Sequence, residues 1–428
     1  MTRARQIIFL HLQQSFTFAI LLDEYYVAQL VALLRKKMVG FSLLLFCCTV
    51  IIKNRRKHFL TSPLKGTVIM PIMKIRGGDL DLVEYEFKSF APKTILKTLG
   101  LEKKKYKLAP VKGNVTVKAP ARIHLTVLDM NRFAPDHPGG GGIGFAIQCY
   151  CTASVECTKN EISINYGRAP IIENFVAVFK KAVGYTGGFT ITAKDHEQKH
   201  VGLGSTSTVM IAVATAMNVA VGSPLTNTQL RHLIGHNYVE ETADGNVAFG
   251  FETGVGPAVS THGGMAIMGD ELSLVYHHPF AEGKNVHIII PPTDISSAGT
   301  QEFDLLMNKA RTLDYRDREL KAYFFLMDLV PALEKDDLKK VGDVIWEIEF
   351  RGSKRAEVEH HSYGIYHYMS QLRERKIEFV GMSSVGPSIA VVTALYRNAM
   401  DKLLKPLGLS VTISTKVDNK GMTIVHKK

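Results

Sequence analysis

Cysteine is scarce in this chain, with five residues in 428, and three of them are Cys149, Cys151 and Cys157. Three thiols at that spacing lack a fourth ligand and match no common zinc site. So few cysteines also exclude a small scaffold held together by disulfides. We therefore expect reduced, buried or half-buried thiols, a reducing compartment and a cytoplasmic location.

A surplus of positive charge is missing from most of the chain, although the formal net charge is +12. Residues 1–69 contain 10 Lys+Arg and 2 Asp+Glu, a net of +8, which leaves 42 against 38, or +4, for residues 70–428. A body so close to neutral, without an RNA- or DNA-binding motif, predicts no nucleic-acid partner.

The uncharged run over residues 38–52 is short for a membrane span. As a helix it would reach about 22 Å at ~1.5 Å per residue, against a hydrocarbon core of about 30 Å. Three interpretations of residues 1–69 stay open: a marginal membrane anchor, an interfacial helix, or sequence upstream of a true start at Met70 or Met73. We favour the third and expect no membrane partner.

Two well-known phosphate-binding signatures are also absent. No P-loop with its lysine occurs, and Gly202-Leu203-Gly204 lacks the third glycine of a dinucleotide fingerprint. Nevertheless Gly202, Leu203, Gly204, Ser205 and Thr206 lead into an apolar run that predicts a buried helix. Ser205 or Thr206 can cap this helix, and its free N–H groups favour an anion, most often phosphate. Without a lysine, Mg²⁺ with Ser205 as a ligand is the expected counter-charge; the alternative is an ordinary capped core helix.

From residue 111 the pattern predicts a mixed α/β chain in two domains. Residues 1–69 form an extension and 70–110 a basic lead-in, followed by a domain over 111–290 with the phosphate loop and a domain over 291–428. We expect strands at 111–118, 123–128, 143–156, 161–166, 189–193, 285–290, 377–380 and 388–393. We expect helices at 171–183, 209–221, 228–236, 302–313, 318–330, 337–350 and 363–375.

Four further places present groups that suit a ligand. Arg122 and His124 are two apart on a strand and share a face, where they can bind phosphate or carboxylate or form a structural pair. Asp129 can bind Mg²⁺ or ribose hydroxyls, or merely cap a turn. Main-chain donors of Thr253, Gly254 and Gly256 can hold a phosphate or carboxylate, against a plain turn. In a later loop, Ser383 and Ser384 with Gly386 can close over the substrate from the second domain.

Four local motifs together resemble the GHMP superfamily of small-molecule kinases, and within it the β-ribofuranosylaminobenzene 5′-phosphate synthases. The motifs are Pro120-Ala-Arg-Ile-His124 with Asp129-Met-Asn131, Gly140-Gly-Gly-Ile-Gly144, Thr253-Gly-Val-Gly256, and Gly381-Met-Ser-Ser-Val-Gly-Pro387 with Asp418-Asn-Lys-Gly421. The resemblance covers roughly residues 111–428. It implies an α/β (α+β) fold with an S5-like amino-terminal domain and a ferredoxin-like carboxyl-terminal domain.

The resemblance further implies a transferase of methanopterin biosynthesis that joins phosphoribosyl pyrophosphate to p-aminobenzoate, with loss of CO₂ and pyrophosphate. It implies a cleft site with Mg²⁺, a phosphorylated substrate and an aromatic acid as partners, and it places Gly142 and Gly144 in a substrate loop. A homodimer remains an option. The family's Asp before Gly-Gly-Ile-Gly is a glycine here, with Asp136 the nearest carboxylate, and the phosphate loop reads Ser-Thr-Ser instead of Ser-Gly-Thr. These departures keep two alternatives open, an ATP-dependent small-molecule kinase and a catalytically silent ligand-binding homologue.

Overall fold

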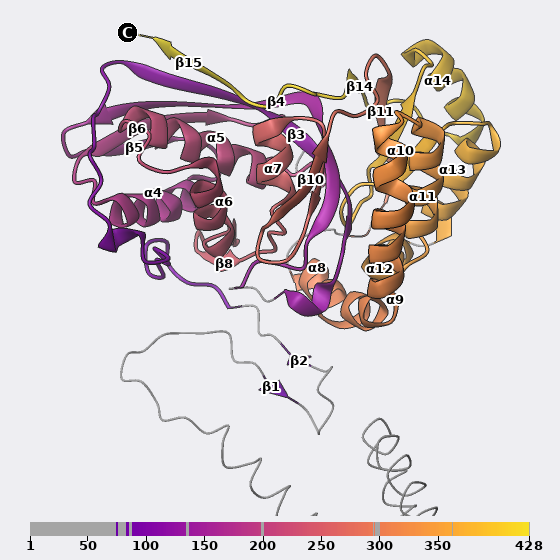
Figure 1. The fold of residues 1–428 in the computed structure, drawn as a ribbon, viewed down its shortest axis with the longest axis horizontal. Helices are drawn as coiled ribbons and strands as arrows, with labels where there is room; N and C mark the ends of the chain where they lie inside the picture. The colour runs from indigo at the N-terminus through magenta and orange to yellow at the C-terminus, as the bar shows by residue number, and fades with distance from the viewer. Residues whose placement is uncertain are drawn as a thin grey trace, which may run out of the picture. The chain divides into compact units, whose positions relative to one another are not determined.

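Two large β-sheets organise the part of the chain that the structure, a computed structural model, describes (Figure 1). That part comprises residues 74–75, 83–84, 88–133, 137–197, 201–293, 295, 300–361 and 363–427. The expectations for residues 1–69 and for Asp136 lie outside it. Residues 70–428 form one compact unit.

The first sheet has seven strands and is built around one long antiparallel pair, β3 (Asn114–Val127) and β4 (Gly142–Thr158). The predicted break between residues 118 and 123 is wrong, because β3 runs through Pro120 with a shift of register between Pro120 and Ala121. Bulges are among the few places where a strand admits proline. The other strands of this sheet are β5 (Ile162–Asn165), β6 (Gly188–Lys194), β9 (Met265–Met268), β10 (Leu274–His278) and β15 (Thr423–Lys427).

Helices lie against the first sheet, and α5 (Ser205–Ala220) packs on both β3 and β4. Every residue of α5 except Val219 is buried, which confirms the buried helix that its apolar sequence predicts. Its neighbours are α4 (Ala169–Val183), α6 (Asn227–His236) and α7 (Val255–His262) (Figure 1). Short elements near the first sheet are β7 (Val239–Glu241), β8 (Val247–Phe249), η1 (Leu101–Lys103) and η2 (Met130–Arg132). The strands β1 (Lys74–Ile75) and β2 (Val83–Glu84) pair with each other in a separate two-stranded sheet.

The second sheet has four antiparallel strands in the order β12-β13-β11-β14. These are β12 (Phe379–Met382), β13 (Ile389–Thr393), β11 (Asn285–Ile289) and β14 (Ile413–Lys416). The helices of this half are α11 (Leu338–Ile348), α12 (Gly352–His360), α13 (Tyr363–Glu374), α14 (Arg397–Leu404) and the short η5 (Lys405–Leu407).

The two helices predicted at 302–313 and 318–330 are one uninterrupted helical run over residues 300–334. It consists of α8 (Thr300–Leu305), a π-helical turn η3 (Leu306–Ala310), α9 (Arg311–Phe324), a second π-helical turn η4 (Phe325–Leu329) and α10 (Val330–Glu334). This run packs against η2 and the end of β3, where the candidate site lies.

The two sheets share an apolar core. Phe145 of the first sheet packs against Phe379 of the second at a ring distance of 5.8 Å, and Phe280 contacts both rings at 5.0 and 5.7 Å. The chain also crosses between the sheets: β11 precedes the predicted boundary at residue 290 and pairs in the second sheet, while β15 returns to the first. The boundary itself stays a prediction. Within the described residues, no helix combines the length and apolarity needed to cross a membrane.

Candidate functional site

The phosphate-type loop turns tightly into α5. Gly202 has φ +89° and Gly204 φ +65°, and Gly204 is the residue that precedes the helix. The expectation that Ser205 or Thr206 caps this helix is wrong, because Gly204 takes the capping position and no side chain caps the first turn in the described chain. The N–H groups of that turn are therefore left for a ligand, together with the positive end of the helix dipole.

Arg168, which the sequence did not single out, holds both hydroxyls at the start of α5. Its guanidinium donates to Thr206 Oγ1 at 2.6 Å and to Ser205 Oγ at 3.1 Å. It also pairs with Asp195 at 3.3 Å, and both side chains are buried. The hydroxyls of Ser205 and Thr206 are thus held in place by a buried guanidinium. No sequence signal marks Arg168, since it follows an ordinary Gly167 turn 37 residues before Ser205.

Arg122 lies against the same loop from β3. Its Nη1 donates to the carbonyl oxygen of Gly202 at 2.9 Å. Burial lowers its pKa, while the carboxylates of Glu252, Glu302 and Glu240 act in the opposite direction. The prediction that Arg122 and His124 line one surface is confirmed, since both face the same cavity.

His124 is a buried, neutral imidazole. Burial, followed by the charges of Arg122 and Lys354, holds its pKa well below the ordinary value. Its Nε2 lies 3.3 Å from the hydroxyl of Thr253. A positive charge on this ring is disfavoured, so the ring suits hydrogen bonding to its neighbours.

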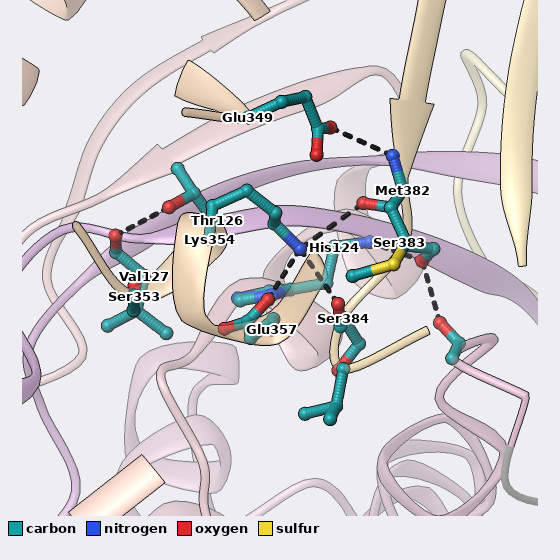
Figure 2. Close-up of polar contacts among 12 residues, drawn as sticks. His124, Thr126, Val127, Glu349, Ser353, Lys354, Glu357, Met382, Ser383 and Ser384 are labelled. Carbon is teal, nitrogen blue, oxygen red and sulfur yellow. Dashed lines mark hydrogen bonds and ion pairs between the residues drawn. The ribbon is translucent and has the colours of Figure 1, made fainter. Parts of the chain in front are cut away.

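The late loop around Ser383 joins the strand to the phosphate loop (Figure 2). The backbone N–H of His124 donates to Ser383 Oγ at 3.1 Å, and Ser383 Oγ donates to the Gly202 carbonyl at 2.7 Å. Ser384 N–H donates to the His124 carbonyl at 2.6 Å. Ser384 and Gly386 line the cavity, whereas Ser383 is wholly buried behind it.

A buried lysine anchors this loop from α12. Lys354 Nζ donates to the carbonyls of Ser384 at 2.7 Å and Met382 at 3.2 Å, and it pairs with Glu357 at 2.5 Å (Figure 2). Glu349 accepts a hydrogen bond from Met382 N at 2.8 Å. The sequence reasoning missed this cluster because α12 was not predicted.

The second glycine-rich segment was predicted as a loop, but its centre is α7. A Cβ on Gly256 would lie 2.2 Å from Ser207 Oγ, so glycine lets the starts of α7 and α5 meet. Glu252 accepts hydrogen bonds from Ser207 Oγ at 2.8 Å and from Gly254 N at 2.7 Å. The Gly254 N–H is therefore already used within the protein, while Thr253 and Gly256 line the cavity.

Besides Ser383 and Gly254, three predicted site residues lie outside the cavity lining. Gly142 and Gly144 pair with β3 beneath it, where a Cβ on Gly144 would lie 2.3 Å from the Ile123 carbonyl. Asp129 caps the turn η2 by accepting from Asn131 N at 2.9 Å, and its other oxygen lies 3.5 Å from Arg318. Asp129 therefore performs the capping role that the sequence left as its alternative.

The cavity has a volume of about 390 Å³, within the usual range for a small-molecule site. Its polar lining includes Arg122, His124 and the phosphate loop. Its apolar lining consists of Val127, Met130, Phe133, Phe249, Phe251, Phe303, Leu306 and Val385, and its acidic lining of Glu240, Glu241, Glu252, Glu302 and Glu357.

The residues around Ser205 fit a metal poorly. The guanidinium of Arg168 lies 3.1 Å from Ser205 Oγ, and a neighbouring positive charge opposes a second cation. No group of three or more His, Cys, Asp or Glu side chains that could hold a metal is found among the described residues. A magnesium ion would therefore depend on ligands that a phosphorylated substrate brings with it.

Comparison with known proteins gives a consistent family. The sequence profile of the GHMP kinases N terminal domain matches residues 170–253. Beta-ribofuranosylphenol 5′-phosphate synthase of Archaeoglobus fulgidus is 25% identical over 332 residues, which are 72% of this chain and 98% of that protein. The protein of the same name from Methanothermobacter thermautotrophicus is 25% identical over 305 residues, or 65% and 88% of the two chains.

Solved structures show the same fold. Homoserine kinase from Cytophaga hutchinsonii aligns with a TM-score of 0.55 at 16% identity, over 74% of this chain and 99% of that chain. Mevalonate diphosphate decarboxylase from Staphylococcus aureus aligns with a TM-score of 0.53 at 15% identity, over 73% and 98%. The expected two-domain α/β fold and the resemblance to this superfamily are confirmed. The relatives' name contains a phenol where the sequence resemblance suggested an aminobenzene.

Proposed function

Since the chain is an enzyme of the GHMP superfamily, we propose that it transfers the phosphoribosyl group of phosphoribosyl pyrophosphate to a para-substituted benzoic acid, releasing CO₂ and pyrophosphate. The observation that carries this proposal is one cavity lined both by an anion-binding loop with Arg122 and by several phenylalanines, among them Phe133, Phe251 and Phe303. The loop suits a diphosphate and the phenylalanines suit an aromatic ring.

The chain's own residues perform defined tasks in this reaction. The N–H groups at the start of α5 receive the pyrophosphate oxygens, and their charge is stabilised as the C1–oxygen bond breaks. Arg122 contributes a fixed positive charge, for a phosphate or for the acceptor carboxylate. The neutral His124 keeps the Thr253 hydroxyl in place.

We propose that Mg²⁺ would enter the site bound to the substrate phosphates. Mg²⁺ keeps waters and binds through substrate phosphates together with one or two protein oxygens. The expected ligand, Ser205 Oγ, already accepts from the Arg168 guanidinium, so we propose that the substrate phosphates and waters would hold the ion. When bound, the ion would neutralise charge on the leaving pyrophosphate.

The acceptor is either p-aminobenzoate or p-hydroxybenzoate. The first follows from the resemblance in the motifs, and the second from the phenol in the relatives' name. Both acids carry an electron-donating group opposite the carboxylate, and that group makes the carboxyl-bearing carbon nucleophilic. Both therefore belong in the same assay.

The test combines the protein, Mg²⁺ and phosphoribosyl pyrophosphate with each acid labelled in its carboxyl group. We expect pyrophosphate and labelled CO₂ in equal amounts. Arg122→Ala should lower kcat/KM by about 10²-fold, the usual scale for one preorganised charge contact. The matched control is Arg316→Ala, since Arg316 is exposed on α9. Pyrophosphate without CO₂, or neither product, contradicts the proposal.

A small-molecule kinase is the second candidate, because carboxylates such as Glu302 face the cavity and could serve an acceptor hydroxyl. The same assay with ATP in place of phosphoribosyl pyrophosphate separates the two. ADP formation that depends on a small alcohol favours the kinase.

A further inference from the structure

Part of the cavity lining is a surface of phenylalanine rings that pack on one another. Phe133 and Phe251 stack with ring centroids 4.7 Å apart, and Phe303 follows Phe251 at 5.8 Å. Phe133 and Phe303 are almost fully buried, at 2% and 3% exposure, so these rings are held in place by the core. A flat ligand ring can pack on such a surface with offset or edge contacts worth about 0.5–1.5 kcal/mol beyond its buried area.

Glu302 lies next to this surface, one residue before Phe303 on α8, and it faces the cavity. Among the described residues, the other buried acids of the cavity have partners: Glu252 accepts from Ser207 and Gly254, and Glu357 pairs with Lys354. Glu302 makes no hydrogen bond or ion pair with any residue in that part of the chain. Its carboxyl group is therefore available to a ligand.

The charges around Glu302 favour a basic carboxylate. Burial raises its pKa to about 8, and Glu240 on β7 and Glu357 on α12 act in the same direction, against the opposing charge of Arg122 on β3. A carboxylate with a pKa near neutral accepts a proton better than an ordinary one. Arg122, which contacts the phosphate loop at the Gly202 carbonyl, lines the same cavity as Glu302 and the phenylalanines.

We infer that Glu302 is a catalytic residue that takes the proton of the para substituent of an aromatic acid whose ring lies against Phe133, Phe251 and Phe303. This inference rests on the proposed function, and it assigns the acceptor subsite and the group that activates the acceptor.

The step balances for p-hydroxybenzoate. The hydroxyl proton passes to Glu302, and the oxygen lone pair feeds into the ring, whose carboxyl-bearing carbon forms the bond to C1 of the ribose. The C1–oxygen bond breaks, and pyrophosphate leaves with its electron pair. The bond to the carboxyl carbon then breaks to release CO₂. Its electrons restore the aromatic ring, and the phenolate oxygen recovers the proton from Glu302. With p-aminobenzoate, Glu302 takes and returns a proton of the amino group in the same way.

The experiment compares Glu302→Gln with Glu302→Asp and with the control Asp304→Asn, which removes an exposed carboxylate from the same helix. We expect Glu302→Gln to lower kcat with p-hydroxybenzoate by about 10²-fold or more, the usual contribution of a general base. Below pH 8, where Glu302 is protonated, the KM for phosphoribosyl pyrophosphate should stay within about twofold. Glu302→Asp should recover part of the rate, and Asp304→Asn should match the wild type.

The pH profile gives a readout that a structural role would not change. Glu302 is protonated below its pKa and is a base above it, so wild-type kcat should rise as the pH passes about 8. That rise should be absent in Glu302→Gln. A wild type that turns over while Glu302→Gln keeps its kcat and the rising limb overturns the inference and leaves the proposed function standing.

Calorimetric titration with p-hydroxybenzoate alone tests the subsite separately. Phe251→Ala should weaken binding of this acid by about tenfold, the scale of one lost aromatic contact. A wild type that makes no product, yet loses binding in Phe251→Ala, overturns the proposed function and retains the subsite. Unchanged binding in Phe251→Ala overturns the subsite.

Discussion

Replacing Gly204 with alanine tests whether the loop before α5 is an anion site. Gly204 has φ +65°, and an added Cβ would lie 2.8 Å from Arg122 Nε, closer than real Cβ contacts. The left-handed backbone alone costs an alanine about 1–2 kcal/mol. In addition Arg122 must move away from the Gly202 carbonyl, which it now contacts at 2.9 Å.

Gly283→Ala is the matched control, because Gly283 has φ +75° but nothing within 4 Å of an added Cβ. In thermal unfolding Gly283→Ala should lose only the stability that the backbone strain costs, and Gly204→Ala should lose more because Arg122 must also move. Only Gly204→Ala should weaken binding of phosphoribosyl pyrophosphate with Mg²⁺. A displaced charged hydrogen bond is worth about 1.5–3 kcal/mol, or roughly 10- to 100-fold in the calorimetric Kd. If both variants bind as tightly as the wild type, the loop is an ordinary helix start and the reasoning fails.

Two further predictions concern buried charges. Arg168→Met should lower the free energy of unfolding by about 3–5 kcal/mol, because it leaves the buried Asp195 carboxylate without its ion-pair partner. Urea unfolding measures this loss, and a loss below about 1 kcal/mol contradicts the prediction. Burial raises the pKa of Glu349 to about 8, so the native state keeps this proton at a pH where the unfolded chain has lost it. Wild-type stability should therefore fall by up to about 1.4 kcal/mol per pH unit between about pH 4.5 and 8. Glu349→Gln should lack this fall. If the difference in free energy of unfolding between the wild type and this variant is the same at pH 5 and at pH 8, the prediction is refuted.

The sequence predicts best where one local pattern decides the structure. The apolar run over residues 209–221 makes a buried helix because no face of it can meet water, and two glycines before it make the tight entry. Arg122 and His124 face the same cavity because residues two apart on a strand share a face. These two features account for the phosphate-type loop, Arg122 and His124 in the candidate site.

The sequence misleads where a tertiary contact overrides the local signal. Pro120 indicates a break, yet β3 continues because the bulge beside it tolerates a missing N–H. The glycines between 250 and 264 indicate a loop, yet Gly256 is required inside α7 because Ser207 lies against it. Serine is a common helix-capping residue, but the Arg168 guanidinium binds the hydroxyl of Ser205. In each case the deciding neighbour is distant in the sequence.

The glutamates and the phenylalanines that line the cavity could not be predicted as site residues from the sequence. Glu240, Glu302 and Glu357 come from β7, α8 and α12, and nothing in one sequence indicates that these elements meet. Phe133, Phe251 and Phe303 are likewise separated by at least 50 residues from one another. A single carboxylate or phenylalanine is an ordinary residue until the fold places it beside others.

The charge of the cavity lining constrains how it can receive a diphosphate. Arg122 is the only Arg or Lys among the described lining residues, against five glutamates. Burial raises the pKa of Glu252, Glu302 and Glu357, so near neutral pH these groups carry less negative charge than ordinary carboxylates. Raising the pH therefore has two opposite effects: it creates the base at Glu302, and it adds negative charge that repels the diphosphate. The first effect acts on kcat and the second on the KM for phosphoribosyl pyrophosphate. Removing the Glu302 carboxylate should abolish the first effect and weaken the second, a combination that loss of folding would not produce.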